Sequence, residues 1–191
     1  MRTIKVLGLD LDGTLVKMKL DFKEIRKDLG IPEGDLLSYV RTRPPAEGKR
    51  LLKKIADRER AVAESAELMP GASELLLYCK EKGIKVVLIT RNSEAAAQRT
   101  LEVLGIGVDL LIARDHADPK PSPESLFLAM NHFGIKPHEM AFVGDYLYDI
   151  QAGNAAGVKT VLIMGQEGCA EWETLANFTA DDLYDVIDLM R

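Results

Sequence analysis

The chain has 191 residues, of which 47% are hydrophobic and 29% are charged. This composition is typical of a soluble globular protein and excludes a disordered tail, and the length fits one core domain with a small annex. The chain carries 25 basic and 30 acidic residues, so its formal net charge is -5. A surface that follows the phosphates of nucleic acid usually has the opposite sign, so we expect no nucleic-acid partner.

The two cysteines, Cys79 and Cys169, lie far apart in the sequence and belong to no CxxC or Cys/His cluster. They therefore predict neither a disulfide framework nor a structural zinc site, and we expect reduced thiols. The longest apolar runs are far shorter than the roughly 20 residues that span a bilayer. We expect a cytoplasmic protein with no export signal and no contact with a membrane.

Short apolar runs rich in β-forming residues alternate along the chain with helical patterns. The first run, residues 4–11, is apolar on both faces and stops at an Asp-Gly-Thr turn, which predicts a central strand that ends in a loop. Further strands are predicted at 84–90, 109–113, 140–144 and 159–163, and helices at 72–82, 93–104, 123–133 and 149–156. This alternation predicts an α/β fold, a Rossmann-like parallel sheet with helices on both faces.

A helical insertion, residues 17–68, interrupts this alternation after the first strand. Three apolar stripes predict three helices within it: Phe22, Ile25 and Leu29; Leu36, Leu37 and Val40; and Leu51, Leu52, Ile55 and Val62. A segment of this size rarely forms a core of its own, so we expect it to pack over the sheet as a lid. The chain thus divides into an α/β core of residues 1–16 and 69–191 and an inserted cap of residues 17–68.

The helical insertion is the basic part of the chain. It holds 13 basic and 10 acidic residues, so it carries +3 while the remainder carries -8. A charge run on a helix is most often a solvated face. Four of its basic residues are nevertheless candidates for binding an acidic substrate: Lys17, Lys19, Arg41 and Arg43.

Polar side chains follow four of the predicted strands. Asp10 and Asp12 come at the end of the first strand, Thr90 after the second, Lys120 beyond the third, and Asp145 and Asp149 after the fourth. In open parallel sheets the ligand site lies at the carboxyl ends of the strands, so these loops should converge on one pocket. Four carboxylates would repel one another there by roughly 4 kcal/mol per pair at 4 Å, and a cation must lie among them.

A set of oxygen ligands without histidine or cysteine favours Mg²⁺, and an oxygen of a substrate phosphate often completes the coordination shell of this ion. Magnesium and Lys120 together would form a positively charged binding site for a dianion. An ionised Asp10 is then a candidate nucleophile, and Asp12 a candidate acid that protonates the leaving alkoxide and a base that activates water. Thr90 can donate a hydrogen bond to a phosphoryl oxygen.

The same residues resemble the signatures of the haloacid dehalogenase-like hydrolases. The segments in question are 10–16 (DLDGTLV), 88–90 (LIT), 118–123 (DPKPSP) and 144–149 (GDYLYD), and all four occur in the family's order. The resemblance covers about residues 1–16 and 69–165. The insertion after the first segment looks like the helical cap of the phosphoglycolate phosphatase-like branch, although it is shorter than many of those caps.

The resemblance implies a nucleophile at Asp10 and an acid/base at Asp12. It also implies magnesium ligation by the Asp10 carboxylate, the Asp12 main-chain carbonyl and Asp145, with Asp149 supporting the metal directly or through water. Thr90 and Lys120 would hold the transferring phosphoryl group, and Arg91, which directly follows Thr90, would reach the same phosphate. Asn92 is either a further substrate contact or a helix cap, and Asp149 could cap the helix that follows it.

We therefore expect a magnesium-dependent phosphatase that acts on a small phosphorylated metabolite such as phosphoglycolate or a sugar phosphate. A phosphosugar mutase would use the same aspartyl-phosphate but return the phosphoryl group to its substrate. A phosphoacceptor domain of the receiver type is disfavoured, because a receiver carries its acceptor on a middle strand and has no insertion after the first. The sequence indicates neither the particular substrate nor the oligomeric state.

Overall fold

The computed structural model of the chain describes residues 1, 3–17, 20–165 and 168–191. Its centre is a parallel sheet with strand order β3-β2-β1-β4-β5-β6. The strands are β1 (Val6–Leu9), β2 (Lys85–Ile89), β3 (Leu110–Ile112), β4 (Met140–Gly144), β5 (Lys159–Ile163) and β6 (Phe178–Ala180). The predicted fold class, a parallel α/β sheet, is thus confirmed.

Strand β1 lies in the middle of the sheet, between β2 and β4, as its apolar sequence predicts. Its side chains divide between the two faces, with Leu7 and Leu9 in one apolar cluster and Val6 in the other. Strand β2 alternates in the same way, since Val86 and Leu88 share the first cluster and Val87 and Ile89 the second. Strands buried on both faces explain why these segments are continuously apolar.

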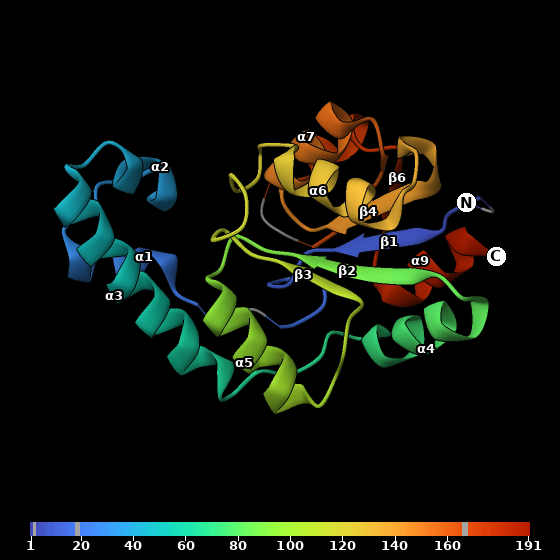
Figure 1. The fold of residues 1–191 in the computed structure, drawn as a ribbon, viewed down its shortest axis with the longest axis horizontal. Helices are drawn as coiled ribbons and strands as arrows, with labels where there is room; N and C mark the ends of the chain where they lie inside the picture. Colours follow the sequence, from blue (N-terminus) through green and yellow to red (C-terminus); the bar gives the residue numbers. More distant parts are fainter. Residues whose placement is uncertain (2, 18–19, 166–167) are drawn as a thin grey trace.

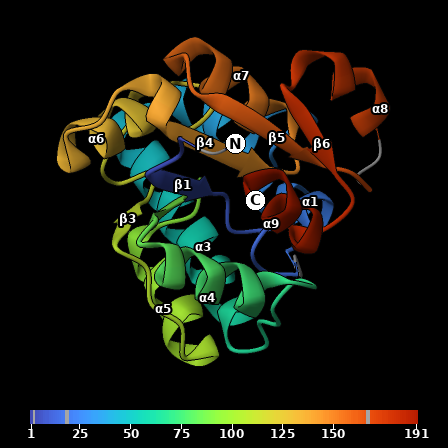
Figure 2. The same ribbon diagram turned by 90° about the vertical axis from the view of Figure 1, so that its right-hand side faces the viewer.

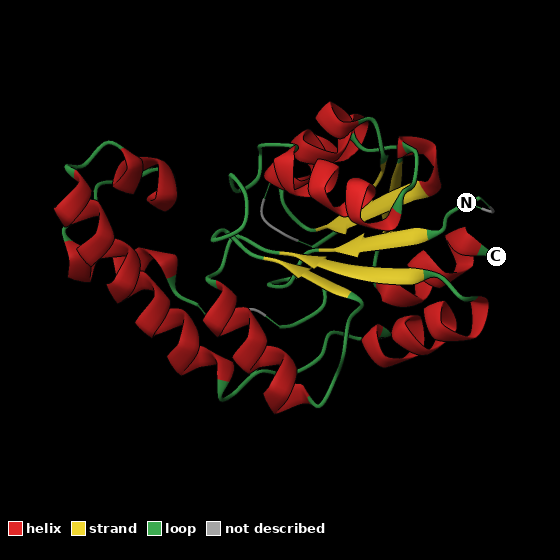
Figure 3. Ribbon diagram, viewed as in Figure 1, coloured by secondary structure: helices red, strands yellow, loops and turns green. Residues whose placement is uncertain are grey.

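Helices cover both faces of the sheet (Figures 1 and 3). The first face carries α4 (Ala72–Lys82), α5 (Glu94–Leu104) and α9 (Leu183–Met190), and the second carries α6 (Glu124–Phe133) and α7 (Leu147–Ala156). A short 3₁₀ helix, η1 (Pro137–Glu139), precedes β4. Both termini lie at the end of the sheet remote from the helical insertion, at the right in Figure 1 and facing the viewer in Figure 2. The carboxyl ends of the strands therefore face the insertion.

The described part of the helical insertion contains α1 (Phe22–Leu29), α2 (Leu36–Arg41) and α3 (Pro45–Ala63). Contrary to expectation, it has a small apolar cluster of its own, which includes Ile25, Val40, Leu51 and Ile55. Its long helix α3 packs beside α5 and does not lie flat over the sheet (Figure 1). Two residues of the predicted stripes, Phe22 and Leu52, are exposed and do not belong to this cluster.

The elements after β5 were not predicted. They are α8 (Cys169–Trp172), the 3₁₀ helix η2 (Glu173–Leu175), β6 and α9. Strand β6 has only three residues, of which Ala180 alone is buried, so it has no detectable alternation. Within the ranges that the structure describes, none of the helices is both long enough and apolar enough to cross a membrane.

Candidate active site

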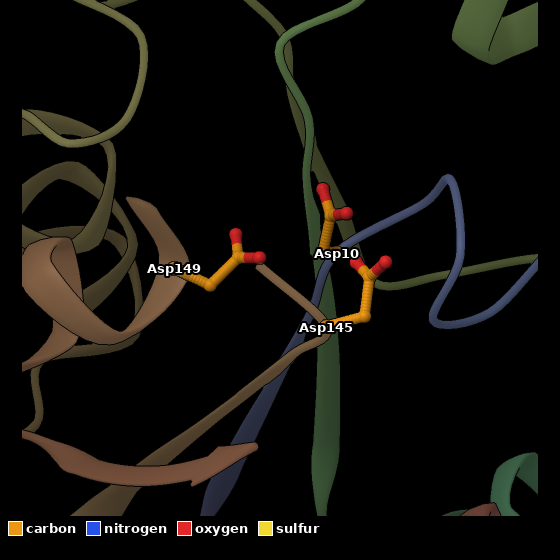
Figure 4. A group of neighbouring side chains, drawn as sticks. All are labelled: Asp10, Asp145 and Asp149. Atoms are coloured by element: carbon orange, nitrogen blue, oxygen red, sulfur yellow. The ribbon is translucent and has the colours of Figure 1, made fainter. Parts of the chain in front are cut away.

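Three buried aspartates meet at the carboxyl edge of the sheet. Asp10 directly follows β1, and its backbone N–H donates to the carbonyl of Val143 (2.9 Å), which continues the pairing of β1 with β4. Asp145 directly follows β4, and Asp149 lies in the first turn of α7. In Figure 4 Asp149 extends toward Asp10 and Asp145, and one oxygen of each carboxylate lies within 4.8 Å of the others. The predicted convergence of these strand ends is confirmed.

Lys120 supplies positive charge to this cluster. Its Nζ lies 2.5 Å from Asp10 Oδ1 and 2.5 Å from Asp149 Oδ1, and it donates a hydrogen bond to the carbonyl of Ile89 (3.0 Å). The ammonium group also lies 5.2 Å from the ring centre of Phe142. The Lys120 side chain is only 2% exposed, so it serves the buried carboxylates and not the solvent.

One ammonium group does not balance three carboxylates. Burial raises the pKa of Asp10 well above its ordinary value, and the charges of Asp149 and Asp145 raise it further against the opposing effect of Lys120. Burial alone lowers the pKa of Lys120, but the carboxylates of Asp10 and Asp149 outweigh burial and raise it. The lysine is therefore protonated, and the cluster can accept a further cation.

The residues present fit a hard divalent ion. Asp10, Asp145 and Asp149 offer only oxygen atoms, which is the donor set that magnesium prefers. They are all buried, which is costly for carboxylates unless positive charge compensates them. This cluster could thus bind a metal ion.

Two glycines allow the loops to approach so closely. Gly13 has a φ of +85°, and a Cβ at that position would lie 2.1 Å from Asp145 Oδ2. A Cβ on Gly144 would lie 2.2 Å from the Cβ of Asp149. Thr14, next to Gly13, donates its hydroxyl to Asp145 Oδ1 (3.3 Å), so the turn after β1 also orients the β4 carboxylate.

Asp149 caps the helix that carries it, as one of the two predictions for this residue states, and it also contacts Lys120. Its Oδ2 accepts the backbone N–H of Tyr146 (3.1 Å), which caps the start of α7, while its Oδ1 faces Lys120. The cap fixes the side chain, because one carboxylate oxygen is held by the helix and the other is directed into the cluster.

The Asp12 side chain lies outside the carboxylate cluster. Its Oδ2 accepts a hydrogen bond from Asn92 Nδ2 (2.6 Å). Burial raises the pKa of Asp12 to about 6, and the charge of Glu59 adds to this, although the Asn92 hydrogen bond lowers it. A carboxyl group with such a pKa can both give and take a proton near neutral pH. The predicted contact of Asp12 with a metal is through its main-chain carbonyl and stays a prediction.

The segment after β2 brings Thr90 and Arg91 to the same edge. Thr90 is buried, and its hydroxyl oxygen accepts the backbone N–H of Asn92 (3.1 Å). A hydroxyl that accepts one hydrogen bond can still donate its proton to a ligand. Arg91 Nη2 instead pairs with Asp35 of the helical insertion (2.5 Å), and its guanidinium lies 4.7 Å from the ring centre of Tyr148. Phosphate binding by Thr90, Arg91 and Lys120 stays a prediction.

The basic candidates of the helical insertion have other neighbours. Arg41 pairs with Asp118 (2.9 Å), and Lys17 lies 3.9 Å from Glu67. The guanidinium of Arg43 lies over the ring of Tyr39, 4.5 Å from its centre. Lys19 lies outside the described residues. A role for these side chains in substrate binding stays a prediction.

Sequence reasoning missed a buried ion pair beside the site. Glu59 on α3 and Arg114 after β3 lie 2.5 Å apart, and their side chains are 4% and 7% exposed. Both residue types are usually exposed, and neither belongs to one of the four sequence motifs. The one available signal was the position of Glu59 on the same face of the helix as Leu51 and Ile55, at a spacing of four residues.

A scan against protein-family models matches residues 4–157 to the haloacid dehalogenase-like hydrolases. The chain belongs to this family. The match spans both the strand-end residues and the helical insertion, and it confirms the resemblance found in the sequence. The family assignment makes the chain a hydrolase.

Curated relatives and solved structures agree with this family. The chain is 29% identical to the phosphoglycolate phosphatase of Chromobacterium violaceum, over 100% of this chain and 98% of that protein. It is 30% identical to the N-acetylmuramic acid 6-phosphate phosphatase of Pseudomonas putida, over 84% and 82% of the two chains. The crystal structure of a hydrolase from Pseudomonas syringae superposes with a TM-score of 0.82 at 21% identity and covers 97% of both chains, which shows a shared fold.

Proposed function

We propose that this haloacid dehalogenase-like hydrolase is a magnesium-dependent phosphatase that hydrolyses the monoester of a small phosphorylated metabolite. One observation carries the proposal: Lys120 lies 2.5 Å from Asp10, inside a cluster of three buried carboxylates at the ends of β1 and β4. A carboxylate that is held beside positive charge suits attack on a phosphate dianion, because the cation offsets the repulsion between the two anions. The phosphatase names of the relatives support the same class of substrate.

In the first step Asp10 attacks the phosphorus atom of the ester. A bond forms between a carboxylate oxygen and phosphorus, and the bond from phosphorus to the leaving alkoxide breaks. Asp12 donates its proton to that alkoxide, which leaves as an alcohol; its pKa of about 6 keeps a useful fraction protonated. Lys120 stays paired with Asp10 and Asp149 and holds the nucleophile in place.

In the second step water attacks the aspartyl-phosphate. Asp12, now ionised, takes the proton from that water, and inorganic phosphate leaves as Asp10 is restored. Thr90 would donate its hydroxyl to a phosphoryl oxygen in both steps. Asp10, Asp145, Asp149 and the Asp12 carbonyl would hold magnesium, which when bound supplies charge that stabilises the transferring phosphoryl group.

Release of inorganic phosphate from a panel of metabolites tests the proposal. The panel contains phosphoglycolate, N-acetylmuramic acid 6-phosphate, other sugar phosphates and nucleotides, each with magnesium and with a chelator. We expect magnesium-dependent release from at least one member and none from the Asp10→Asn variant. Asp188→Asn is the matched control, because this exposed aspartate of α9 pairs only with a neighbouring arginine among its described contacts.

Two results would contradict the proposal. Phosphate release by Asp10→Asn at the rate of the parent would remove the nucleophile. Conversion of a sugar phosphate to its isomer, without free phosphate, would instead identify a phosphosugar mutase.

A further inference from the structure

Glu59 is a buried carboxylate on a helix of the insertion, and its partners belong to the core. Its Oε1 pairs with Arg114 Nη1 at 2.5 Å, and its Oε2 accepts two hydrogen bonds from Ser93, one from the backbone N–H and one from the hydroxyl, each 3.1 Å long. Ser93 precedes α5 and Arg114 follows β3. One side chain of the helical insertion thus binds two loops at the carboxyl edge of the sheet.

Arg114 extends this contact along the segment that follows β2. Its Nη1 also donates to the carbonyl of Arg91 (2.9 Å), and its backbone N–H donates to the carbonyl of Asn92 (3.1 Å). Together with Ser93, which Glu59 binds directly, three consecutive residues are held by this pair. The side chains of the pair thus bond to Ser93 and Arg91, on either side of Asn92.

This same segment orients the predicted acid/base. Asn92 donates its side-chain amide to Asp12 Oδ2 at 2.6 Å and its backbone N–H to the Thr90 hydroxyl at 3.1 Å. A continuous chain of contacts thus leads from α3 through Ser93 and Arg114 to Asn92 and ends at Asp12.

We propose that Glu59 is a positioning residue that couples the seating of the helical insertion to the orientation of the Asp12 carboxyl group. When α3 is seated on α5, the Glu59 carboxylate lies between Ser93 and Arg114, and Asn92 is held against Asp12. When α3 moves away, Arg114 and Ser93 lose their bonds to Glu59, and residues 91–93 are held less firmly. The inference rests on the proposed phosphatase function, because it concerns the proton transfers assigned to Asp12.

The chain offers a control that separates positioning from simple docking of the insertion. Glu64, at the end of the same helix, forms a two-pronged ion pair with Arg99 of α5, with distances of 2.7 and 2.8 Å. This pair also joins the insertion to the core, but in the described part of the chain neither of its side chains bonds to residues 90–93. Because this pair is exposed and therefore weak, its loss leaves α3 seated, with Glu59 still bound to Ser93 and Arg114.

Steady-state kinetics of Glu59→Gln and Glu64→Gln test the inference. For Glu59→Gln we expect kcat to fall roughly 10- to 100-fold with little change in KM, because a small misplacement of a catalytic group has that order of effect on rate. For Glu64→Gln we expect kcat close to that of the parent. Asn92→Ala should lower kcat as well, and the double variant Glu59→Gln/Asn92→Ala should be no slower than the slower single variant, since both changes act through one contact.

Three results would overturn the inference. The first is an equal loss of kcat in Glu59→Gln and Glu64→Gln, and the second is a parental kcat in Glu59→Gln. The third is a double variant in which the two single losses of kcat multiply. If Glu59→Gln does not fold, Ser93→Ala replaces it, because that change removes only one of the three bonds to Glu59; we then expect a smaller loss of kcat, again without a change in KM.

A crystal structure of Glu59→Gln separates this inference from the proposed function. If the parent protein releases no phosphate from any compound, the proposed function fails, and the contact between Asn92 and Asp12 is still measurable. Loss of that contact in Glu59→Gln supports the coupling, and its retention with residues 91–93 unmoved overturns it.

Discussion

Replacement of Lys120 by methionine isolates the role of positive charge among the three aspartates. Methionine keeps most of the length and the apolar stem of the lysine, so packing beside Phe142 is largely retained, while the ammonium group is lost. The loss leaves Asp10 and Asp149 without a partner that lies 2.5 Å from each. Removing one partner of a buried ion pair typically costs about 3–5 kcal/mol, because a charge remains buried and uncompensated.

The arrangement of the carboxylates supports a value in this range. Two unit charges 4.8 Å apart, the separation within which the three carboxylate oxygens lie, repel by about 3.5 kcal/mol at an effective dielectric constant near 20. For a chain of this size each kcal/mol lowers Tm by about 2–4 °C. We therefore expect Lys120→Met to lower the free energy of unfolding by about 3–5 kcal/mol and Tm by roughly 6–20 °C in the absence of divalent ions.

The stability loss should depend on pH with a defined sign. The pKa of Asp10 is already above its unfolded value and should rise further without Lys120. A raised folded-state pKa makes the ionised carboxyl a destabilising group at pH values above the unfolded pKa, and protonation relieves this at lower pH. The deficit of Lys120→Met should thus be largest near pH 8, shrink as the pH falls toward the unfolded pKa of the aspartates, and shrink when magnesium is added.

Urea unfolding followed by circular dichroism, at several pH values with chelator or magnesium, measures these effects. Lys85→Met is the matched control: Lys85 pairs with Asp109 at 2.7 Å, but its side chain is 56% exposed, and such pairs contribute at most about 1 kcal/mol. A Lys120→Met deficit no larger than that of the control, or one insensitive to both pH and magnesium, would refute the electrostatic account of the cluster.

Three further predictions concern the turn after β1, the metal and the proton. Gly13→Ala should lower the Tm of the protein more than Gly30→Ala does. Both glycines have a positive φ, but only at Gly13 would a Cβ collide with Asp145. Thermal unfolding of the two variants measures the difference. Magnesium at 100 times its Kd should stabilise the parent by about 2.7 kcal/mol and so raise its Tm. Asp145→Asn should abolish this rise in Tm. Because the pKa of Asp12 is about 6, kcat/KM should fall as the pH rises above that value. Asn92→Ala removes a hydrogen bond to the ionised form of Asp12, so it should move this fall to higher pH. A pH-rate profile of Asn92→Ala with the fall at the parental pH would contradict the role of Asp12 as the acid.

The sequence predicted most of the core because its signals are local. The first five strands and the helices between them follow from apolar runs and three- and four-residue spacing, and parallel topology then brings Asp10, Asp145 and Lys120 to one edge. Helix α9 was missed although its buried residues, Leu183, Val186, Ile187 and Met190, follow a helical spacing. Strand β6 carried no comparable signal, because its one buried residue is an alanine.

Contacts between the helical insertion and the core could not be predicted, because they join residues that lie far apart in the sequence. Arg91 illustrates this: its place after Thr90 suggested a phosphate ligand, but no local signal indicated that its guanidinium also pairs with Asp35 of the insertion. The net charge of the insertion was equally uninformative, since Arg41 pairs with the core residue Asp118. Sequence separation of 56 and 77 residues hides both pairs from any local pattern.

These ion pairs between the insertion and the core differ in what they can contribute. Arg41–Asp118 and Arg99–Glu64 are exposed, so each adds at most about 1 kcal/mol to the docking of the insertion. Glu59–Arg114 is buried, and desolvation of two charges offsets most of their attraction, so its presence is poorly explained by stability alone. A buried ion pair does fix relative positions, because Glu59 makes all its bonds only when α3, Ser93 and Arg114 lie in one arrangement. That arrangement is also the one that holds Asn92 against Asp12, and for this reason we assign the buried pair to orientation of the site and the exposed pairs to docking of the insertion.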